Sequence, residues 1–238
     1  MANRACEVCG ADAFEPLAVD AGYAWERCRS CGFVRLSDRL SPATVAAGED
    51  SCWEQYAADY ERKFASKMRR TRHRARRIWR RRPGTRFLDV GSNYGFMVEA
   101  AAECGFDPIG VDISTGLVRA ARARFPGRDF RAGALEEQDF GEARFDCVYC
   151  SEVIEHTVDP RIFARGIAAA MRPGALLYLT TPHVREYARR GWRAMAAPDH
   201  KMYFTEDTIE RLLRAAGFTD IEQEFTFRRG IKLWAVRG

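Results

Sequence analysis

The sequence predicts an α/β fold with an open, mostly parallel sheet, an antiparallel C-terminal hairpin and a small N-terminal unit. Residues 86–112 read as strand, glycine turn, helix and strand, because two short apolar runs flank a turn and an apolar helix. The chain ends in two strands joined only by residues 228–230, and so short a connection requires antiparallel pairing. The predicted strands cover residues 86–90, 108–112, 129–131, 145–150, 175–182, 221–227 and 231–236.

Capping residues and helix breakers mark the helices between these strands. Ser114 and Thr205 are each placed to cap a helix, and the run 172–174, Arg-Pro-Gly, ends a helix that begins at Pro160. No clear periodicity appears between His183 and Tyr203, so we expect a long irregular insertion of the kind that forms a substrate lid. The predicted helices cover residues 96–102, 114–124, 160–171 and 208–216.

The composition allows one α/β core with a small appendage, because the 238 residues are 47% hydrophobic. No apolar stretch approaches the length of about 20 residues that spans a bilayer, and no leader follows Met1, so we expect a soluble, cytoplasmic protein without a membrane partner. The net charge of +5 is modest and does not require a nucleic-acid partner. The composition fixes no oligomeric state.

The glycine turn at residues 91–95 is a candidate ligand site. The first N–H groups of the following helix point back at the turn and can hold a polar or anionic ligand. Asp112 ends the next strand about 20 residues later, where a carboxylate reaches ribose hydroxyls. Such a turn suits NAD, FAD or S-adenosylmethionine. A dinucleotide site would carry glycine at Asn93 and Phe96, so the spacing disfavours the first two.

The pattern Asp89-x-Gly91-x-x-x-Gly95, followed by Gly110-Val111-Asp112, resembles the S-adenosylmethionine site of class I methyltransferases. The resemblance covers residues 86–238 and implies a Rossmann-like, seven-stranded class I methyltransferase sheet with an antiparallel C-terminal hairpin. Relatives often carry glycine where Asn93 stands, but asparagine tolerates left-handed geometry. With aromatic side chains from the preceding helix, the expected cofactor-binding residues are Tyr56, Tyr60, Asp89, Gly91, Ser92, Asn93, Gly95, Asp112, Ile113, Ala134, Leu135 and Ser151.

Four cysteines near the N-terminus form a specific metal-binding motif. Cys6-x-x-Cys9 and Cys28-x-x-Cys31 are separated by 18 residues, and each pair is followed by a glycine that allows a tight knuckle. Four thiolates predict structural zinc, because a catalytic zinc keeps one position open and a redox pair would not be repeated. We therefore expect a zinc ribbon at 1–40, a linker and helices covering the cofactor site at 41–82, and the methyltransferase domain at 83–238.

Two features of residues 41–82 allow both a structural and a functional interpretation. Trp53, Tyr56, Tyr60 and Phe64 share one helical face, which either packs on the core or closes over the cofactor. Residues 67–82 are rich in arginine, which lines either the solvent face of a helix or a site for an anionic substrate or polyanion such as RNA.

The segment Glu152-x-x-Glu155-His156 follows a predicted strand and faces the same crevice as the glycine turn. It resembles Glu-x-x-Glu-His in ubiquinone-biosynthesis O-methyltransferases and small-RNA 2′-O-methyltransferases, where these side chains bind a divalent metal. Alternatively, Glu155 caps or forms an ion pair while His156 lines the acceptor pocket or acts as general base. His200 is a candidate base, a fourth metal ligand or a structural loop residue.

Together these patterns predict a methyltransferase that acts on a small molecule. Oxygen is the expected acceptor atom, with nitrogen and carbon as alternatives. The aromatic and arginine residues of 183–203 favour a flat or anionic acceptor. The expected catalytic residues are His156, Glu155 and His200. The competing hypotheses are an RNA methyltransferase that uses residues 67–82 and a non-catalytic binding module that keeps the fold.

Overall fold

The computed structural model describes residues 5–38, 40–41, 44, 60–141, 144–224 and 230–238. Its larger sheet has seven strands in the order β10-β11-β8-β7-β4-β5-β6. The pairs β8–β7, β7–β4, β4–β5 and β5–β6 are parallel, whereas β11 pairs antiparallel with both β8 and β10. The predicted sheet is therefore confirmed. Its strands are β4 (Arg86–Val90), β5 (Asp107–Asp112), β6 (Asp129–Ala132), β7 (Phe145–Ser151), β8 (Met171–Thr181), β10 (Phe218–Gln223) and β11 (Ile231–Arg237).

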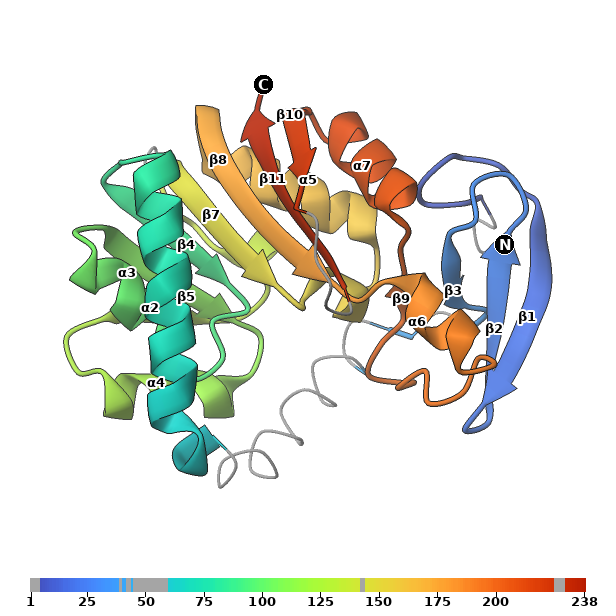
Figure 1. Cartoon of the computed structure of the whole chain (residues 1–238), viewed down its shortest axis with the longest axis horizontal. Coiled ribbons are helices and arrows are strands. Elements are labelled where there is room, and N and C mark those ends of the chain that lie inside the picture. The colour runs from blue at the N-terminus through green and yellow to red at the C-terminus, as the bar shows by residue number, and fades with distance from the viewer. Residues whose placement is uncertain (1–4, 39, 42–43, 45–59, 142–143, 225–229) are drawn as a thin grey trace.

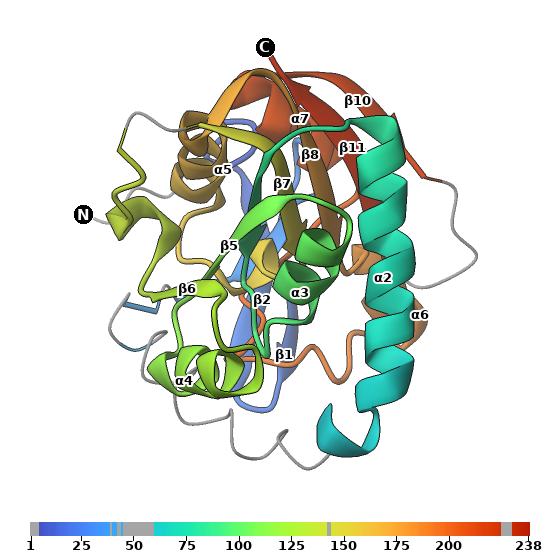
Figure 2. The same cartoon turned by 90° about the vertical axis from the view of Figure 1, so that its left-hand side faces the viewer.

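Helices cover both faces of this sheet, with α2, α3 and α4 on one side and α5 and α7 on the other (Figures 1 and 2). Neighbouring residues of β4 pack against the helices on opposite sides of the sheet, because successive side chains of a strand point to opposite faces. Phe87 packs in a core cluster with residues of α2 and α3, whereas Leu88 packs with residues of α5 and α7. These helices are α2 (Phe64–Arg81), α3 (Phe96–Glu103), α4 (Thr115–Arg124), α5 (Pro160–Ala170) and α7 (Glu206–Ala215).

A second, four-stranded antiparallel sheet lies at the opposite end of the molecule from α2, α3 and α4 (Figure 1). Its order is β1-β2-β3-β9, and we call it the ribbon sheet. Three strands come from the N-terminus, and the fourth comes from the segment 183–203. The strands are β1 (Phe14–Asp20), β2 (Tyr23–Cys28), β3 (Val34–Leu36) and β9 (Met202–Tyr203).

The segment 183–203 is therefore more ordered than the sequence predicts. It contains the short helix α6 (Val184–Arg189) as well as β9. A strand of two residues has no hydrophobic period of its own, and β9 exists because β3 offers it a partner. The expectation of an irregular insertion is corrected accordingly.

Strands β8 and β10 also begin several residues before the predicted positions. β8 begins at Met171, before Arg172-Pro173-Gly174, because a register shift between Phe145 and Cys147 of β7 absorbs these residues in a bulge. β10 covers Phe218–Gln223 and so begins earlier than residue 221; residues 225–229 lie outside the described part of the chain.

The predicted caps are confirmed. The Ser114 hydroxyl accepts a hydrogen bond from Leu117 N at 3.2 Å, and Thr205 accepts one from Thr208 N at 3.2 Å. Trp53 and Tyr56 lie outside the described residues, and the domain boundaries near residues 40 and 82 stay predictions. In the described part of the chain, no helix combines the length and apolar character needed to cross a membrane.

Candidate functional site

A cavity of about 930 Å³ opens at the carboxyl ends of β4, β5 and β7. Ligands bind at this edge of open parallel sheets. The cavity brings together most of the residues expected to bind the cofactor. Gly95 is not among its lining residues, and Tyr56 lies outside the described chain. The predicted residues that line it are Tyr60, Asp89, Gly91, Ser92, Asn93, Asp112, Ile113, Ala134, Leu135 and Ser151, joined by His156 from the predicted acceptor side.

The glycine turn closes on β5 through its backbone. Gly91 N and Ser92 N donate to Val111 O at 2.8 and 3.0 Å. Gly91, Asn93 and Gly95 have φ values of 73°, 50° and 79°, all left-handed. Asn93 therefore adopts the left-handed geometry expected of it, and its Oδ1 accepts a hydrogen bond from Tyr94 N at 2.8 Å.

Asp112 is oriented by the turn and by the next helix. Its Oδ2 accepts from Asn93 N at 2.8 Å and its Oδ1 from Ser114 N at 3.0 Å. Both bonds hold the carboxylate at the cavity edge. Asp89 lies at the end of β4, where burial and then the nearby charge of Asp112 raise its pKa well above the usual range.

Aromatic and basic side chains from the part of the chain that precedes β4 form another wall of the cavity. The Tyr60 ring lies 4.3 Å from that of Tyr94 and 5.9 Å from that of Phe96, and the Lys67 Nζ is 3.3 Å from the Tyr60 ring centroid. Tyr60 thus packs on the core side chains and also lines the cavity, so both interpretations of the aromatic face apply to it.

Three basic residues of this wall were not predicted. Lys67, Arg70 and Arg74 line the cavity from α2, and Arg74 Nη1 donates to the Tyr149 hydroxyl at 2.8 Å. Their spacing of three and four residues places them on one helical face, which is a signal present in the sequence. The many other arginines of residues 67–82 make this spacing hard to recognise in the sequence.

Other arginines of α2 are engaged in ion pairs within the fold. Arg72 pairs with Glu103 of α3 at 2.6 Å, and Arg77 and Arg81 pair with Glu224 and Glu222 near the C-terminal hairpin. These contacts support the structural interpretation of the arginine run.

His156 lines the acceptor side of the cavity, whereas Glu155 and His200, the other two expected catalytic residues, lie next to His156 but are not among the lining residues. Glu155, His156 and His200 each offer one ligand atom, and these atoms lie within 4.8 Å of one another. Glu155 Oε2 accepts from the Thr181 hydroxyl at 3.0 Å, while Oε1 is buried and has no hydrogen-bond partner among the described residues. Burial, and then the charge of Glu152, raise the pKa of Glu155 to about 8.

Glu152 lies apart from this group. Its Oε1 accepts a hydrogen bond from the Thr180 hydroxyl at 2.7 Å, and its backbone is left-handed with φ of 58°. Among the described residues, the cluster that could hold a metal therefore takes His200 in place of Glu152.

Asp199 orients the His156 ring, a role that the sequence did not indicate. Asp199 Oδ1 lies 2.9 Å from His156 Nδ1. Burial opposes ionisation of Asp199, but the hydrogen bond and charge of His156 outweigh it and lower the pKa of this carboxyl. The only signal in the sequence was a carboxylate beside His200. The two histidine rings meet edge to face with centroids 4.7 Å apart.

The four N-terminal cysteines converge as predicted. Cys6 Sγ lies 3.7 Å from Cys31 Sγ, and Cys9 Sγ lies 3.6 Å from Cys28 Sγ. A zinc tetrahedron with bonds of about 2.3 Å has sulfur–sulfur edges of about 3.8 Å. The following Gly10 and Gly32 are left-handed and donate back to the carbonyls of Cys6 and Cys28. The donor set thus fits a closed tetrahedral metal site.

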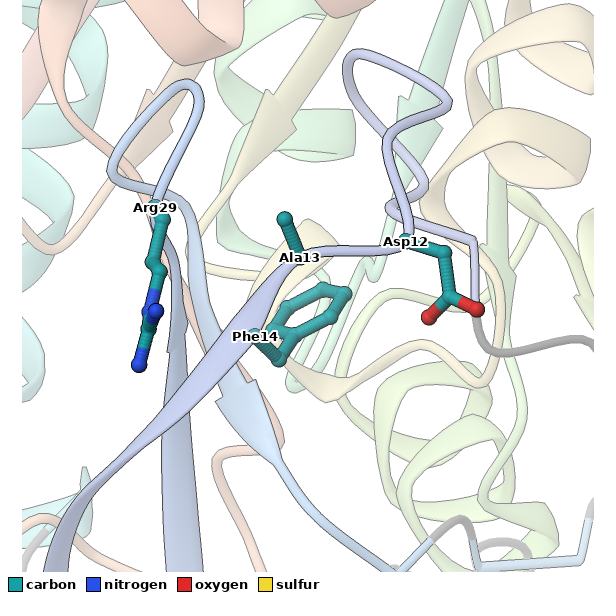
Figure 3. A pocket seen from close by; sticks show the side chains of 4 residues that line it. All are labelled: Asp12, Ala13, Phe14 and Arg29. Atoms are coloured by element: carbon teal, nitrogen blue, oxygen red, sulfur yellow. The ribbon is translucent and has the colours of Figure 1, made fainter.

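A smaller hollow of about 460 Å³ lies on the ribbon, where Arg29 and Asp12 flank Phe14 (Figure 3). Its fourth lining residue is Ala13, and Arg29 already pairs with Glu15 at 3.2 Å. The hollow brings together none of the predicted site residues.

Comparison with known proteins agrees with this geometry. The methyltransferase domain family matches residues 58–223, which is more than half of the chain. The chain belongs to this methyltransferase family. The matched region begins after β3, so the four cysteines lie outside it.

Curated relatives of this methyltransferase include ubiquinone biosynthesis O-methyltransferases. One from Idiomarina loihiensis is 31% identical over 153 residues, covering 58% of this chain and 63% of the relative. Another, from Bradyrhizobium diazoefficiens, is 34% identical over 117 residues and covers 48% and 44% of the two chains. The chain therefore spans less than two thirds of the length of these relatives.

Solved structures share the fold. The complex of the Haloferax volcanii Trm112 methyltransferase activator with a putative methyltransferase gives a TM-score of 0.63 at 19% identity, covering 78% of this chain and 97% of that one. An S-adenosylmethionine-dependent methyltransferase from Mesorhizobium loti gives 0.57 at 22% identity, covering 68% and 95%. Both likenesses confirm the class I methyltransferase architecture.

A methyl group at position 91 should disrupt the turn. The Cβ of Gly91→Ala would lie 2.3 Å from Val153 Cγ2, and φ is left-handed. We expect denaturant unfolding to show a loss of about 1–2 kcal/mol from backbone strain and a further loss of about 1–3 kcal/mol from crowding.

Gly127→Ala is the matched control, because φ is 87° and no atom lies within 4 Å of the added Cβ. It should show the strain alone. Combining Gly91→Ala with Val153→Ala should recover the crowding part; no recovery would contradict this explanation.

Asp112→Asn should weaken binding of S-adenosylhomocysteine, measured by calorimetry. Charged hydrogen bonds contribute about 1.5–3 kcal/mol, so we expect a loss of about ten- to hundredfold. Asp107→Asn changes an exposed residue at the opposite end of the same strand and should leave the affinity unchanged. Equal effects of the two substitutions would exclude Asp112 as a cofactor ligand.

Proposed function

We propose that this chain transfers the methyl group of S-adenosylmethionine to a hydroxyl group of a small-molecule acceptor. The observation that carries the proposal is the placement of the His156–Asp199 pair in the same cavity as Gly91 and Asp112. Oxygen as acceptor is supported by the curated relatives, which are named ubiquinone biosynthesis O-methyltransferases.

The cofactor half of the cavity fits S-adenosylmethionine. Asp112 would accept from the ribose hydroxyls, the turn at Gly91 would border the methionine part, and Ala134 and Leu135 would border the adenine. When bound, the cofactor supplies a methyl on a positively charged sulfur, and the carbon–sulfur bond breaks as the new carbon–oxygen bond forms. The protein's main task is therefore to align the acceptor and to remove its proton.

His156 is the proposed general base. Asp199 is an acceptor when ionised, so the neutral His156 ring donates its proton from Nδ1 and carries the lone pair on Nε2. This nitrogen takes the hydroxyl proton during transfer. Asp199 holds the ring and stabilises the imidazolium that results, as the carboxylate does in other carboxylate–histidine pairs.

The cluster of Glu155, His156 and His200 also fits a divalent metal ion. Two imidazoles and one carboxylate are suitable ligands, and Glu155 Oε1 is a buried acceptor to which no described residue donates a hydrogen bond. Such an ion would lower the proton affinity of a bound acceptor hydroxyl.

The four-cysteine cluster is the proposed zinc site. It would be closed and structural, because all four positions are cysteine sulfurs. Zinc binding would contribute folding energy to residues 5–36, in addition to the burial of Trp25, Phe33, Val34 and Leu36.

Replacing His156 by alanine should lower methyl transfer by about 100-fold or more, in the range of general acid–base contributions. Cofactor affinity should change less than twofold. The assay follows labelled methyl from S-adenosylmethionine to a panel of small phenols and catechols, with and without a carboxylate. His73→Ala removes an exposed imidazole of α2 and serves as the control.

Transfer that is unaffected by His156→Ala would exclude it as the base. Label recovered in cellular RNA instead of the small acceptors would favour the RNA methyltransferase hypothesis. A chain that binds neither S-adenosylmethionine nor S-adenosylhomocysteine would be the non-catalytic module.

The purified chain should contain one zinc ion, measured by elemental mass spectrometry. Cys31→Ser removes one of the four thiolates and should abolish stoichiometric zinc. Cys104→Ser removes a half-buried thiol outside the cluster and should retain it. Zinc retained in full by Cys31→Ser would contradict a four-cysteine site.

A further inference from the structure

Backbone hydrogen bonds connect the ribbon sheet to the acceptor cluster of Glu155, His156 and His200. β9 pairs with β3, so that Val34 lies opposite Tyr203 and Arg35 opposite Met202. The ladder continues one residue further, because Leu36 N donates to Lys201 O at 2.9 Å. Lys201 N in turn donates to the carbonyl of Glu155 at 2.8 Å. Lys201 therefore bridges the edge of the ribbon and the residue at the centre of the acceptor cluster.

A buried ion pair connects the cysteine cluster to β3. Glu7 lies between Cys6 and Cys9, and both of its carboxylate oxygens accept from Arg35 Nη1, at 2.8 and 2.7 Å. Arg35 Nε donates to Glu26 of β2 at 2.8 Å. The side chains of Arg35 and Glu7 are only 8% and 4% exposed, so solvent screens this contact weakly. This ion pair therefore links the Cys6–Cys9 turn to β3, the strand that pairs with β9.

Tyr203 of β9 contacts both the ribbon sheet and His200. Its ring is fully buried and stacks on Trp25 of β2, with centroids 5.3 Å apart. Its hydroxyl donates to the carbonyl of Met195, which can only accept. Because a phenol has one proton, the contact of 3.1 Å between His200 Nδ1 and the same hydroxyl must be donated by the histidine. The neutral His200 ring therefore carries its proton on Nδ1 and its lone pair on Nε2.

We propose that Tyr203 is a positioning residue, through which the four-cysteine ribbon fixes the orientation and tautomer of His200. The role of His200 at the acceptor rests on the proposed function, whereas its coupling to the ribbon rests on the contacts described above. The cofactor turn is built on β4, β5 and α3, and none of these elements pairs with the ribbon sheet. Disturbing the ribbon should therefore separate the two halves of the site, with cofactor binding kept and transfer lost.

Tyr203→Phe tests the last step of this coupling in the full chain. The imidazole ¹⁵N shifts of His200, one of four histidines, should show protonated Nδ1 in the unaltered protein and a mixture of tautomers in the variant. We expect kcat for methyl transfer to fall about tenfold or more and the affinity for S-adenosylhomocysteine to change less than twofold. Tyr23→Phe is the control, since it removes a tyrosine hydroxyl from β2 of the same sheet, and among described residues no side-chain hydrogen bond joins Tyr23 to Tyr203 or His200.

Cys31→Ser tests the beginning of this coupling, from the four-cysteine cluster through β3 to Lys201. Hydrogen exchange at the Leu36 and Lys201 amides should accelerate at least tenfold once elemental analysis shows that the metal is lost, with S-adenosylhomocysteine affinity again within twofold. Unchanged exchange in the metal-free variant, or a His200 tautomer unchanged by Tyr203→Phe, would overturn the proposal. A chain that methylates no hydroxyl acceptor would reject the proposed function alone, because the ¹⁵N shifts and the exchange rates would still decide the coupling.

Discussion

The parallel pairing of β4 with β5 on one side and with β7 on the other is the constraint on which the site depends. Parallel strands end at the same edge, so this pairing brings Asp89, Asp112 and Ser151 to one crevice although they are far apart in the chain. The glycine turn then needs only local geometry to complete the cofactor half. Its hydrogen bonds to Val111 O make it an extension of the sheet.

Different kinds of contact hold the residues of the two halves of the cavity in place. The cofactor half relies on regular secondary structure, with short connections and backbone hydrogen bonds. The acceptor half relies on side chains held by a loop, and that loop is ordered by β3 of another sheet. Buried polar contacts such as Arg35 with Glu7 and Thr181 with Glu155 matter more there, because a buried group that loses its partner bears the full cost of desolvation.

The sequence predicted what depends on local pattern and failed where long-range contact decides. The caps at Ser114 and Thr205, the glycine turn and the cysteine knuckles each have a signature within a few residues, and the structure has each of them. β9 and Asp199 have none, since a strand of two residues and a single carboxylate acquire meaning only from partners elsewhere in the chain. The arginine run shows a third case, in which a real signal at Lys67, Arg70 and Arg74 was hidden by similar residues whose partners lie in the fold.

The pairing of β3 with β9 also has a consequence for the order of assembly. Val34 and Tyr203 are 203 − 34 = 169 positions apart, so this contact closes one of the longest loops in the molecule. During synthesis the N-terminal hairpin can bind its metal early, but the open edge of β3 has no strand to cover it until residue 203 emerges. An uncovered edge is a template for pairing with other chains. Nascent chains that stall between the hairpin and β9 would therefore expose this edge, and the acceptor half of the site cannot form before β9 emerges.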